Sequence, residues 1–378
     1  MKKHLLMIMT ALSLALCLGG CAGQSAGAPA VQLGFIAPLS GDEAAVAAQN
    51  AFQLAIDEAN DSGEFPYTIE AVYADDAADA ATAYREAQLL LLQPQLAAVV
   101  SFSGEDAALA TLPLFNEAAT PLLLGAVSGA RYEYAVQGLP LVMQLQPPLG
   151  TENAPLAELA IDQLGYTEWF VISDISEQGE ANLQRFSDEL AARELAALGV
   201  EQVQTDIMDL RHIAEEIEES NAAAVYCGCN AAVAAQLANE LAAVGVADIF
   251  FCGPSSLYYD SFTKAAASEQ ALSVTAENYP ENAGWLQDFY KSYAAAGYTE
   301  PAGWQAAAAY DAAQVLIEAL RSAGELPDAS AMAAAVAAVQ GAGLQGTISF
   351  DAAGYTQALS WSAYQVTDGA WQPYQAAK

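Results

Sequence analysis

Few side chains in this sequence are suited to covalent chemistry. The chain has 378 residues with five cysteines and two histidines, and only His212 among the histidines lies beyond the first thirty residues. A Ser-His-Asp or Cys-His arrangement would have to use His212, and no neighbouring pattern marks a nucleophile to go with it. The acidic run that follows it is typical of a helix. We therefore expect His212 to be an ordinary helix residue, no residue to be catalytic, and the protein not to be an enzyme.

Three cysteines follow the first thirty residues. Cys227 and Cys229 flank a glycine in one apolar stretch, and Cys252 ends another. An odd number of cysteines does not indicate a disulfide framework, and a metal site built on them would lack a fourth ligand. Free cysteine is among the most buried residue types. The sequence therefore predicts three buried, inert thiols, no metal site and no cofactor.

A turn at Pro38, Ser40 and Gly41 is the first candidate for ligand binding. It follows a short apolar run at 31–37 and precedes a helical pattern, which makes a strand–turn–helix unit. A parallel sheet built from such units binds small ligands at the carboxyl ends of its strands. The turn lies at such an end, so Ser40 is a predicted ligand-side residue.

The elements that position this turn repeat along the chain. Strands are expected at 31–37, 67–73, 96–100, 121–124, 141–146, 169–173, 200–204, 223–226, 249–252, 341–350 and 359–366. Helices are expected between most of these runs, and 285–323 reads as mostly helical. Alternating strands and helices are typical of an α/β fold. A chain of this length exceeds a single hydrophobic core, so two domains are predicted.

The N-terminus has the pattern of an export signal. Two lysines precede an apolar run at 5–18, which is shorter than the ~20 residues that cross a membrane. The run leads to Leu18-Gly19-Gly20-Cys21, which resembles the bacterial lipobox; the alternative is an ordinary cleavable signal with a chance cysteine. We expect residues 1–20 to be a lipoprotein signal peptide, Cys21 to be lipidated, and residues 21–30 to be a tether.

The charge of the chain restricts its partners. Eleven basic residues stand against 46 acidic ones, for a formal net charge of −35 at pH 7. Such a surface repels nucleic acid and anionic lipid headgroups. We expect no nucleic-acid partner, and contact with the membrane only through the lipid at Cys21.

Several pieces in order carry a resemblance to a known family. They include Ile36-Ala37-Pro38-Leu39-Ser40-Gly41, Tyr73-Ala74-Asp75-Asp76, the runs at 99–104, 121–128, 170–174 and 225–228, Cys252-Gly253-Pro254, and Ala309-Tyr310-Asp311-Ala312. In this order and spacing the chain resembles the substrate-binding lipoproteins of branched-chain amino-acid ABC importers. The resemblance implies the type 1 periplasmic-binding (Venus-flytrap) fold, with two doubly wound lobes, parallel sheets and a multi-strand hinge. It places lobe 1 at 31–146 plus 279–341, and lobe 2 at 147–278 plus 342–378.

The resemblance also implies a binding site at the strand ends of both lobes. In lobe 1 the positions that hold a carboxylate in such families correspond to Ser103, Gly104, Ala126 and Ser128. Hydroxyl and backbone N–H donors there give charge-assisted hydrogen bonds to a carboxylate without a buried counter-charge. A plain turn residue is the alternative for Ser128.

Lobe 2 departs from the family pattern. Ser255 stands where an acid usually meets the ligand ammonium, and Gln178 and Asn230 stand where aromatic residues are expected. The loop after Gly41 has alanines and a valine in place of an aromatic residue. The sequence therefore does not specify a simple branched-chain amino acid as the ligand. Side chains that could replace the missing groups are Asp174, Glu177, Tyr258 and Tyr259.

The resulting prediction is an exported solute-binding protein on the outer face of the cell membrane or its periplasmic side. It would capture a small amino acid or related carboxylate between its lobes and deliver it to the permease of an ABC importer, and indirectly to its ATPase. We expect it to be a monomer. The altered pocket leaves an alternative function open. In that alternative the protein is a lipoprotein of the same fold that senses a ligand or regulates an envelope enzyme.

Overall fold

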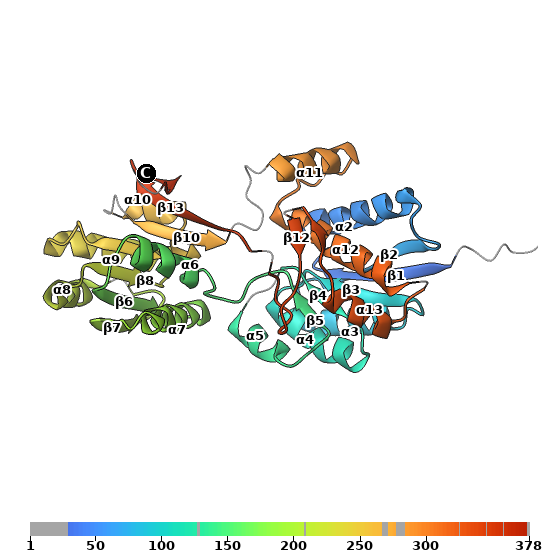
Figure 1. Ribbon diagram of the computed structural model, residues 1–378, viewed down its shortest axis with the longest axis horizontal. Coiled ribbons are helices and arrows are strands. Elements are labelled where there is room, and N and C mark those ends of the chain that lie inside the picture. Colours follow the sequence, from blue (N-terminus) through green and yellow to red (C-terminus); the bar gives the residue numbers. More distant parts are fainter. Residues whose placement is uncertain are drawn as a thin grey trace, which may run out of the picture.

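The computed structural model describes residues 29–126, 129–207, 209–266, 271–276, 284–324, 326–344, 346–357 and 359–375. The signal peptide, Cys21 and most of the tether predicted from the sequence lie outside these residues, as does Ser128. The described chain forms two lobes side by side, each built on its own sheet (Figure 1). The predicted two-lobed α/β fold is confirmed. None of the described helices is long and apolar enough to cross a membrane.

The first lobe contains a sheet of five parallel strands. These are β1 (Ala30–Ala37), β2 (Thr68–Asp75), β3 (Leu96–Ser101), β4 (Leu122–Leu124) and β5 (Val142–Gln144), in the order β2-β1-β3-β4-β5. Because all five run in one direction, their carboxyl ends meet at one edge of the sheet. That edge faces the second lobe and holds the turns after β1 and β3 (Figure 1).

Helices cover both faces of this sheet. They are α2 (Glu43–Ser62), α3 (Ala80–Leu91), α4 (Glu105–Glu117) and α5 (Ala130–Val136), joined from the C-terminal part by α11 (Gly284–Ala295), α12 (Trp304–Ala323) and α13 (Ala329–Ala337). One buried cluster joins the sheet to α2, α12 and α13, and another joins its other face to α3 and α4. Small residues such as Ala51, Ala55 and Ala309 are fully buried between α2 and α12, which lets these two long helices approach closely.

The start of α2 shows how the sequence places a helix at the strand-end edge. Asp42 precedes the helix, and its carboxylate accepts hydrogen bonds from the amides of Ala44 at 2.9 Å and Ala45 at 3.1 Å. Such a cap satisfies amides that would otherwise lack partners in the first turn. The helix ends at Gly63, whose φ of 71° is a left-handed conformation that glycine adopts without strain.

The second lobe contains a mixed sheet of seven strands. These are β6 (Trp169–Asp174), β7 (Gly199–Val203), β8 (Ala224–Cys227), β9 (Phe250–Gly253), β10 (Leu272–Ala276), β13 (Trp361–Thr367) and β14 (Ala370–Pro373). The order is β14-β13-β10-β9-β8-β6-β7, with β13 and β14 antiparallel to their neighbours and the other five parallel. The helices are α6 (Asn153–Ala157), continued by the π-helical turn η1 (Glu158–Gln163), then α7 (Glu177–Ala192), α8 (Arg211–Ser220), α9 (Ala231–Val244), the 3₁₀ turn η2 (Ser255–Leu257) and α10 (Asp260–Ala265).

One lobe boundary predicted from the sequence is wrong. Residues 342–357 were expected in the second lobe, but the hairpin of β11 (Gly341–Gly343) and β12 (Gly346–Ile348) packs on the first. Asp311 of α12 is buried and accepts the Leu344 amide at 2.6 Å, and Ile348 belongs to the first-lobe core. Beyond the hairpin, Thr356 donates to the Gln144 carbonyl at 2.9 Å and so extends the edge at β5. The chain thus returns to the second lobe only before β13.

Candidate functional site

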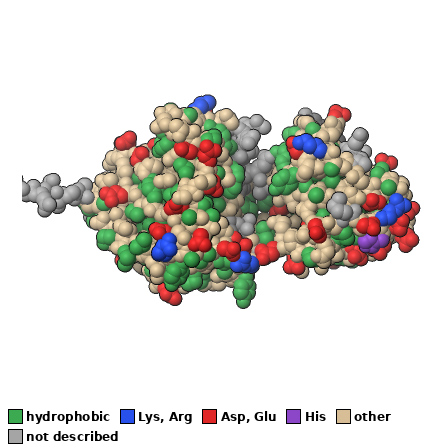
Figure 2. All heavy atoms as spheres, turned by 180° about the vertical axis from the view of Figure 1, so that it is seen from behind, with side chains coloured by type: hydrophobic (Ala, Val, Ile, Leu, Met, Phe, Trp, Pro, Cys, Tyr) green, Lys and Arg blue, Asp and Glu red, His purple; other side chains and the backbone are tan. Residues whose placement is uncertain are grey.

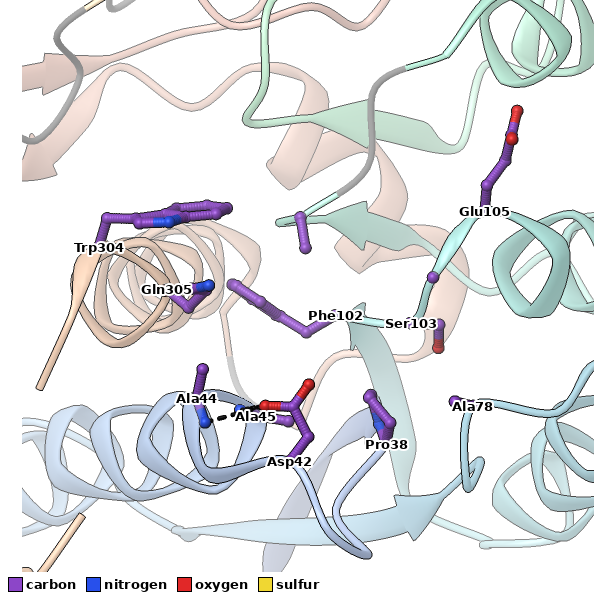
Figure 3. A pocket seen from close by; sticks show the side chains of 12 residues that line it. Pro38, Asp42, Ala44, Ala45, Ala78, Phe102, Ser103, Glu105, Trp304 and Gln305 are labelled. Atoms are coloured by element: carbon purple, nitrogen blue, oxygen red, sulfur yellow. Dashed lines mark hydrogen bonds between the residues drawn. The ribbon is translucent and has the colours of Figure 1, made fainter. Parts of the chain in front are cut away.

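A hollow of about 490 Å³ opens at the strand-end edge of the first lobe (Figure 3). It is lined by Pro38, Asp42, Ala44, Ala45, Ala78, Phe102, Ser103, Gly104, Glu105, Ala126, Trp304 and Gln305. All of these residues belong to the first lobe. The predicted residues Ser103, Gly104 and Ala126 are brought together here, whereas Ser40 and the predicted residues of the second lobe do not line the hollow.

Hydrogen-bond donors enter the hollow between β3 and α4. Ser103 is fully buried, and within the described residues its hydroxyl makes no well-formed hydrogen bond. Gly104 directly precedes α4 without a side-chain cap, and a side chain added to it would meet no atom within 4 Å. The first amides of a helix lack intrahelical partners and carry partial positive charge. This corner therefore presents unpaired amides to an anionic group, and the buried Ser103 hydroxyl lies next to the carboxyl group of Asp76.

Two neighbouring carboxylates behind this corner have opposite environments. Asp75, at the end of β2, accepts hydrogen bonds from the Ser40 hydroxyl and, at 3.2 Å, from the Ser40 amide. The hydroxyl bond is the main cause that lowers the pKa of Asp75. Asp76 is fully buried, and burial raises its pKa, although the nearby Ser103 hydroxyl opposes the effect. Ser40 thus secures the turn after β1 and does not face the hollow.

The apolar part of the hollow comes from aromatic side chains that sequence reasoning did not select. Phe102 points toward Gln305, and Trp304 lies beside it at the start of α12 (Figure 3). The Phe102 ring stacks on Phe35 with centroids 5.6 Å apart, and a side chain at Gly125 would lie 2.2 Å from it. The loop after Gly41 contains no aromatic residue. In the structure, Trp304 provides an aromatic side chain to the hollow from a distant part of the chain.

The three predicted residues of the second lobe are engaged within that lobe. Asn230 caps α9, accepting from the amides at 232 and 233 at 3.0 and 3.1 Å and donating to the Thr205 carbonyl at 2.8 Å. Gln178 donates to the Asn182 side chain at 3.1 Å. Ser255 donates to the carboxylate of Glu152 at 2.7 Å. These contacts are intact while the lobes stand apart, so each residue has a structural role before any ligand binds.

Two of the side chains suggested as replacements, Asp174 and Tyr258, are also engaged. Asp174 is buried, and its carboxylate accepts the amides of Ser176 at 3.1 Å and Asn230 at 2.9 Å. Tyr258 packs against Tyr364 with ring centroids 4.3 Å apart. The acid that the sequence did not single out is Glu152, which is only 7 % exposed.

The three cysteines and His212 have contrasting environments. Cys227, Cys229 and Cys252 are free and buried, as predicted. A hydrogen bond with the Cys227 thiol, together with burial, raises the pKa of Cys229 far above its ordinary value, which opposes formation of a reactive thiolate. His212 is exposed on α8. Among the described residues, no three His, Cys, Asp or Glu side chains gather as a metal would require.

Solved structures share this fold at low sequence identity. One, described as a branched-chain amino acid ABC transporter from Rhodospirillum rubrum, matches with TM-score 0.77 and 23 % identity, covering 91 % of this chain and 100 % of that one. An ABC transporter substrate-binding protein from Desulfitobacterium hafniense in complex with Leu matches with TM-score 0.69 and 19 % identity, over 91 % and 100 % of the chains. A solute-binding protein from Rhodopseudomonas palustris in complex with 3,4-dihydroxybenzoic acid matches with TM-score 0.61 and 19 % identity, over 92 % and 98 %.

The family assignment rests on a match along nearly the whole chain. No curated protein matches the chain. The family model described as periplasmic binding protein matches residues 30–370, which span both lobes and all the strands of the two large sheets except the last three residues of β14. The family resemblance inferred from the sequence is thereby confirmed, and the chain belongs to the periplasmic binding protein family.

Proposed function

We propose that this protein is an extracytoplasmic solute-binding protein that captures a small carboxylate-bearing molecule between its lobes and delivers it to an ABC importer. The observation that carries the proposal is the first-lobe hollow, in which a buried hydroxyl and open helix amides lie beside an aromatic wall. Leucine and 3,4-dihydroxybenzoic acid, the ligands named for two similar structures, both combine a carboxylate with an apolar body. The hollow matches that shared chemistry.

The charges around the hollow decide how an anionic group would be held. Asp42 and Glu105 line the hollow and no lysine or arginine does, so a carboxylate would have to be held by neutral donors, away from these two acids. Glu105 and Asp106 begin α4, and Arg131 lies 3.7 Å from the former and 3.0 Å from the latter. This arginine offsets part of the negative charge at the entrance.

A thermal-shift screen followed by calorimetric titration tests the proposed function. Amino acids and simple aromatic and aliphatic carboxylates would be added to the protein lacking residues 1–21. A ligand that binds raises the melting temperature by mass action, and Ser103→Ala is expected to weaken its affinity about tenfold through loss of one charge-assisted hydrogen bond. Absence of any shift across the screen would contradict the function; an unchanged affinity in Ser103→Ala would contradict the placement of the carboxylate.

The location and anchoring of the protein are part of the proposal. Membership of the periplasmic binding protein family supports an extracytoplasmic location, and the sequence Leu18-Gly19-Gly20-Cys21 supports lipidation at Cys21. The importer permease is the proposed protein partner, with the binding protein acting as a monomer and without catalysis. Metabolic labelling with a fatty acid should mark the full-length chain but not a Cys21→Ala variant. Equal labelling of the two would contradict the anchor.

A further inference from the structure

Helix α5 of the first lobe and helix α7 of the second lobe come into contact beside the first segment that connects the lobes (Figure 1). In that segment, the Leu149 amide donates a hydrogen bond to the carboxylate of Glu133 on α5. The next residue, Gly150, packs on α7: a Cβ added to it would lie 3.0 Å from the side chain of Arg185 and 3.2 Å from the Ala181 carbonyl oxygen. Two consecutive residues of the connection are thus held by Glu133 on one side and lie against Arg185 on the other.

Glu133 and Arg185 lie near each other without forming an ion pair. Both residues are half-buried. Burial raises the pKa of Glu133, while the hydrogen bond from Leu149 and the positive charge of Arg185 oppose the rise. Tyr355, in the last segment that leads to the second lobe, is close enough to both for their charges to act on its pKa, which burial raises. Among the described residues, Arg185 has no hydrogen-bond or ion-pair partner. A half-buried guanidinium on one lobe therefore stands unpaired near a half-buried carboxylate on the other.

A second pair of opposite charges faces across the same two helices. Arg131, in the first turn of α5, donates to Asp106 at 3.0 Å, and this hydrogen bond is the main cause that raises the pKa of Arg131. The negative charge of Glu177, the first residue of α7, contributes to the same rise from the second lobe. Glu177 is exposed and has no bonded partner in the described part of the chain. Only 11 of the 378 residues are lysine or arginine, so abundance alone does not account for two of them opposite acids of the other lobe.

We propose that α5 and α7 form a charge latch, in which Glu133 pairs with Arg185, and Arg131 with Glu177, when the lobes close. This inference rests on the lobe closure that the proposed function contains. Neither pair is formed in the structure, where a groove separates the lobes (Figure 2). An attraction that is realised in only one of two arrangements shifts the equilibrium toward that arrangement. The half-buried pair should contribute more than the exposed pair, because water and salt screen exposed charges.

Chemical bridging of the two helices measures how often they meet in the absence of any ligand. In the protein without residues 1–21, Arg131→Cys and Glu177→Cys would be combined and treated with 1,3-propanediyl bismethanethiosulfonate, which joins two thiols that come close together. This reporter protein lacks the exposed pair and so isolates the half-buried one. The three native cysteines of the described chain are buried and should not react. Bridging should be about tenfold faster than in a control with Leu89→Cys and Leu198→Cys, two half-exposed positions on α3 and beside β7, which lie far apart on different lobes (Figure 1).

Variants of the half-buried pair then test whether its charges bring the helices together. In the reporter protein, Glu133→Gln, which keeps an oxygen for the Leu149 amide, and Arg185→Gln should each slow bridging about threefold. The double variant should be no slower than either single variant, because both remove the same interaction. Glu117→Gln removes an exposed acid at the end of α4; it controls for net charge and should leave the rate unchanged. Melting curves confirm that each variant is folded.

Salt provides the same test without a substitution in the half-buried pair. About 1 M sodium chloride should slow bridging in the reporter protein but not in the double variant, because screened charges no longer attract each other. Bridging as slow as in the control with cysteines at 89 and 198, or bridging that keeps its rate in the folded variants or at high salt, would overturn the latch. The proposed function would then be unaffected, because the ligand screen tests it separately. If bridging depends on these charges while the screen finds no ligand, the latch stands and the proposed function falls.

Discussion

The two strand-end edges of this protein differ in how much of their chemistry is already in use. On the first lobe, the amides after Gly104 have no side-chain cap, and Phe102 and Trp304 line the same hollow. On the second lobe, Asn230 caps a helix and Gln178 is tied to Asn182. The first edge thus has backbone donors without a side-chain cap, whereas the polar side chains of the second edge are held in contacts within their own lobe.

This difference suggests a division of labour. The space-filling view in Figure 2 shows the lobes separated by a groove, and every residue that lines the hollow lies on the first. A ligand would therefore meet the first lobe and its neutral donors before closure. The second lobe would then complete the site and select among the molecules already held.

The largest effect is expected from Gly125 on the first lobe. A Cβ there would lie 2.2 Å from the Phe102 ring, so Gly125→Ala should displace the ring and lower the free energy of unfolding by about 1–3 kcal/mol. Chemical denaturation measures this loss. Gly284→Ala, where a Cβ meets no atom within 4 Å, is the matched control and should cost nothing. Adding Phe102→Leu should recover part of the loss; an unaltered stability of Gly125→Ala would show that the aromatic wall is not tightly built.

The next effect concerns Trp304, which is 42 % exposed at the rim of the hollow. Trp304→Ala should weaken ligand binding about 10- to 30-fold because an aromatic contact is lost, with little change in stability. Tyr84→Ala is the control, since Tyr84 is 44 % exposed on α3 and does not line the hollow. Calorimetry with the ligand from the screen measures both. Equal affinities of the two variants would argue against an aromatic wall around the ligand.

A smaller effect on the second lobe tests whether Asn230 is structural. Removing its cap in Asn230→Ala should lower the free energy of unfolding by about 1 kcal/mol, whereas Asn230→Ser keeps an acceptor for the two α9 amides and should retain more of the stability. Both variants should bind ligand with similar affinity once folded. A selective loss of affinity in Asn230→Ser would instead make this side chain part of the binding site.

The smallest effects are opposite pH dependences at Asp75 and Asp76. The native pKa of Asp75 is lowered, so its stabilisation is present above the unfolded pKa of about 3.9 and is lost as pH falls. The native pKa of Asp76 is raised, so its penalty is absent below that value and develops as pH rises. Relative to the wild type, Asp75→Asn should therefore be less stable at pH 7 than at pH 3, and Asp76→Asn more stable. Melting curves of both variants and the wild type at the two pH values measure these differences. If the melting temperatures of the two variants change in the same direction between pH 3 and pH 7, relative to the wild type, the two environments are not opposite.

The strand-end positions of the first lobe were predicted from the family resemblance, and the order of the strands agrees with it. Ser103, Gly104 and Ala126 each come directly after a buried strand, and parallel strands bring their carboxyl ends to one edge. Alternating strands and helices likewise predicted the α/β lobes. Ser40 follows a strand too, but its hydroxyl is taken by Asp75, a contact between residues 35 positions apart that no local pattern indicates.

The features that escaped prediction depend on long-range packing. Trp304 reaches the hollow from the start of α12, far along the chain from β1 and β3. Glu152 is one of 46 acidic residues, and only its burial and its bond to Ser255 distinguish it. Helix α13 is mostly alanine and has no marked apolar stripe, and α5 and α10 are short, so periodicity did not reveal them.

Small-angle X-ray scattering with and without ligand tests the central claim most directly. If a small molecule is bound first by the edge with Ser103 and then enclosed by the second lobe, saturation with the ligand from the screen should reduce the radius of gyration. A wild-type protein that is saturated with ligand and scatters as it does without ligand would contradict the account.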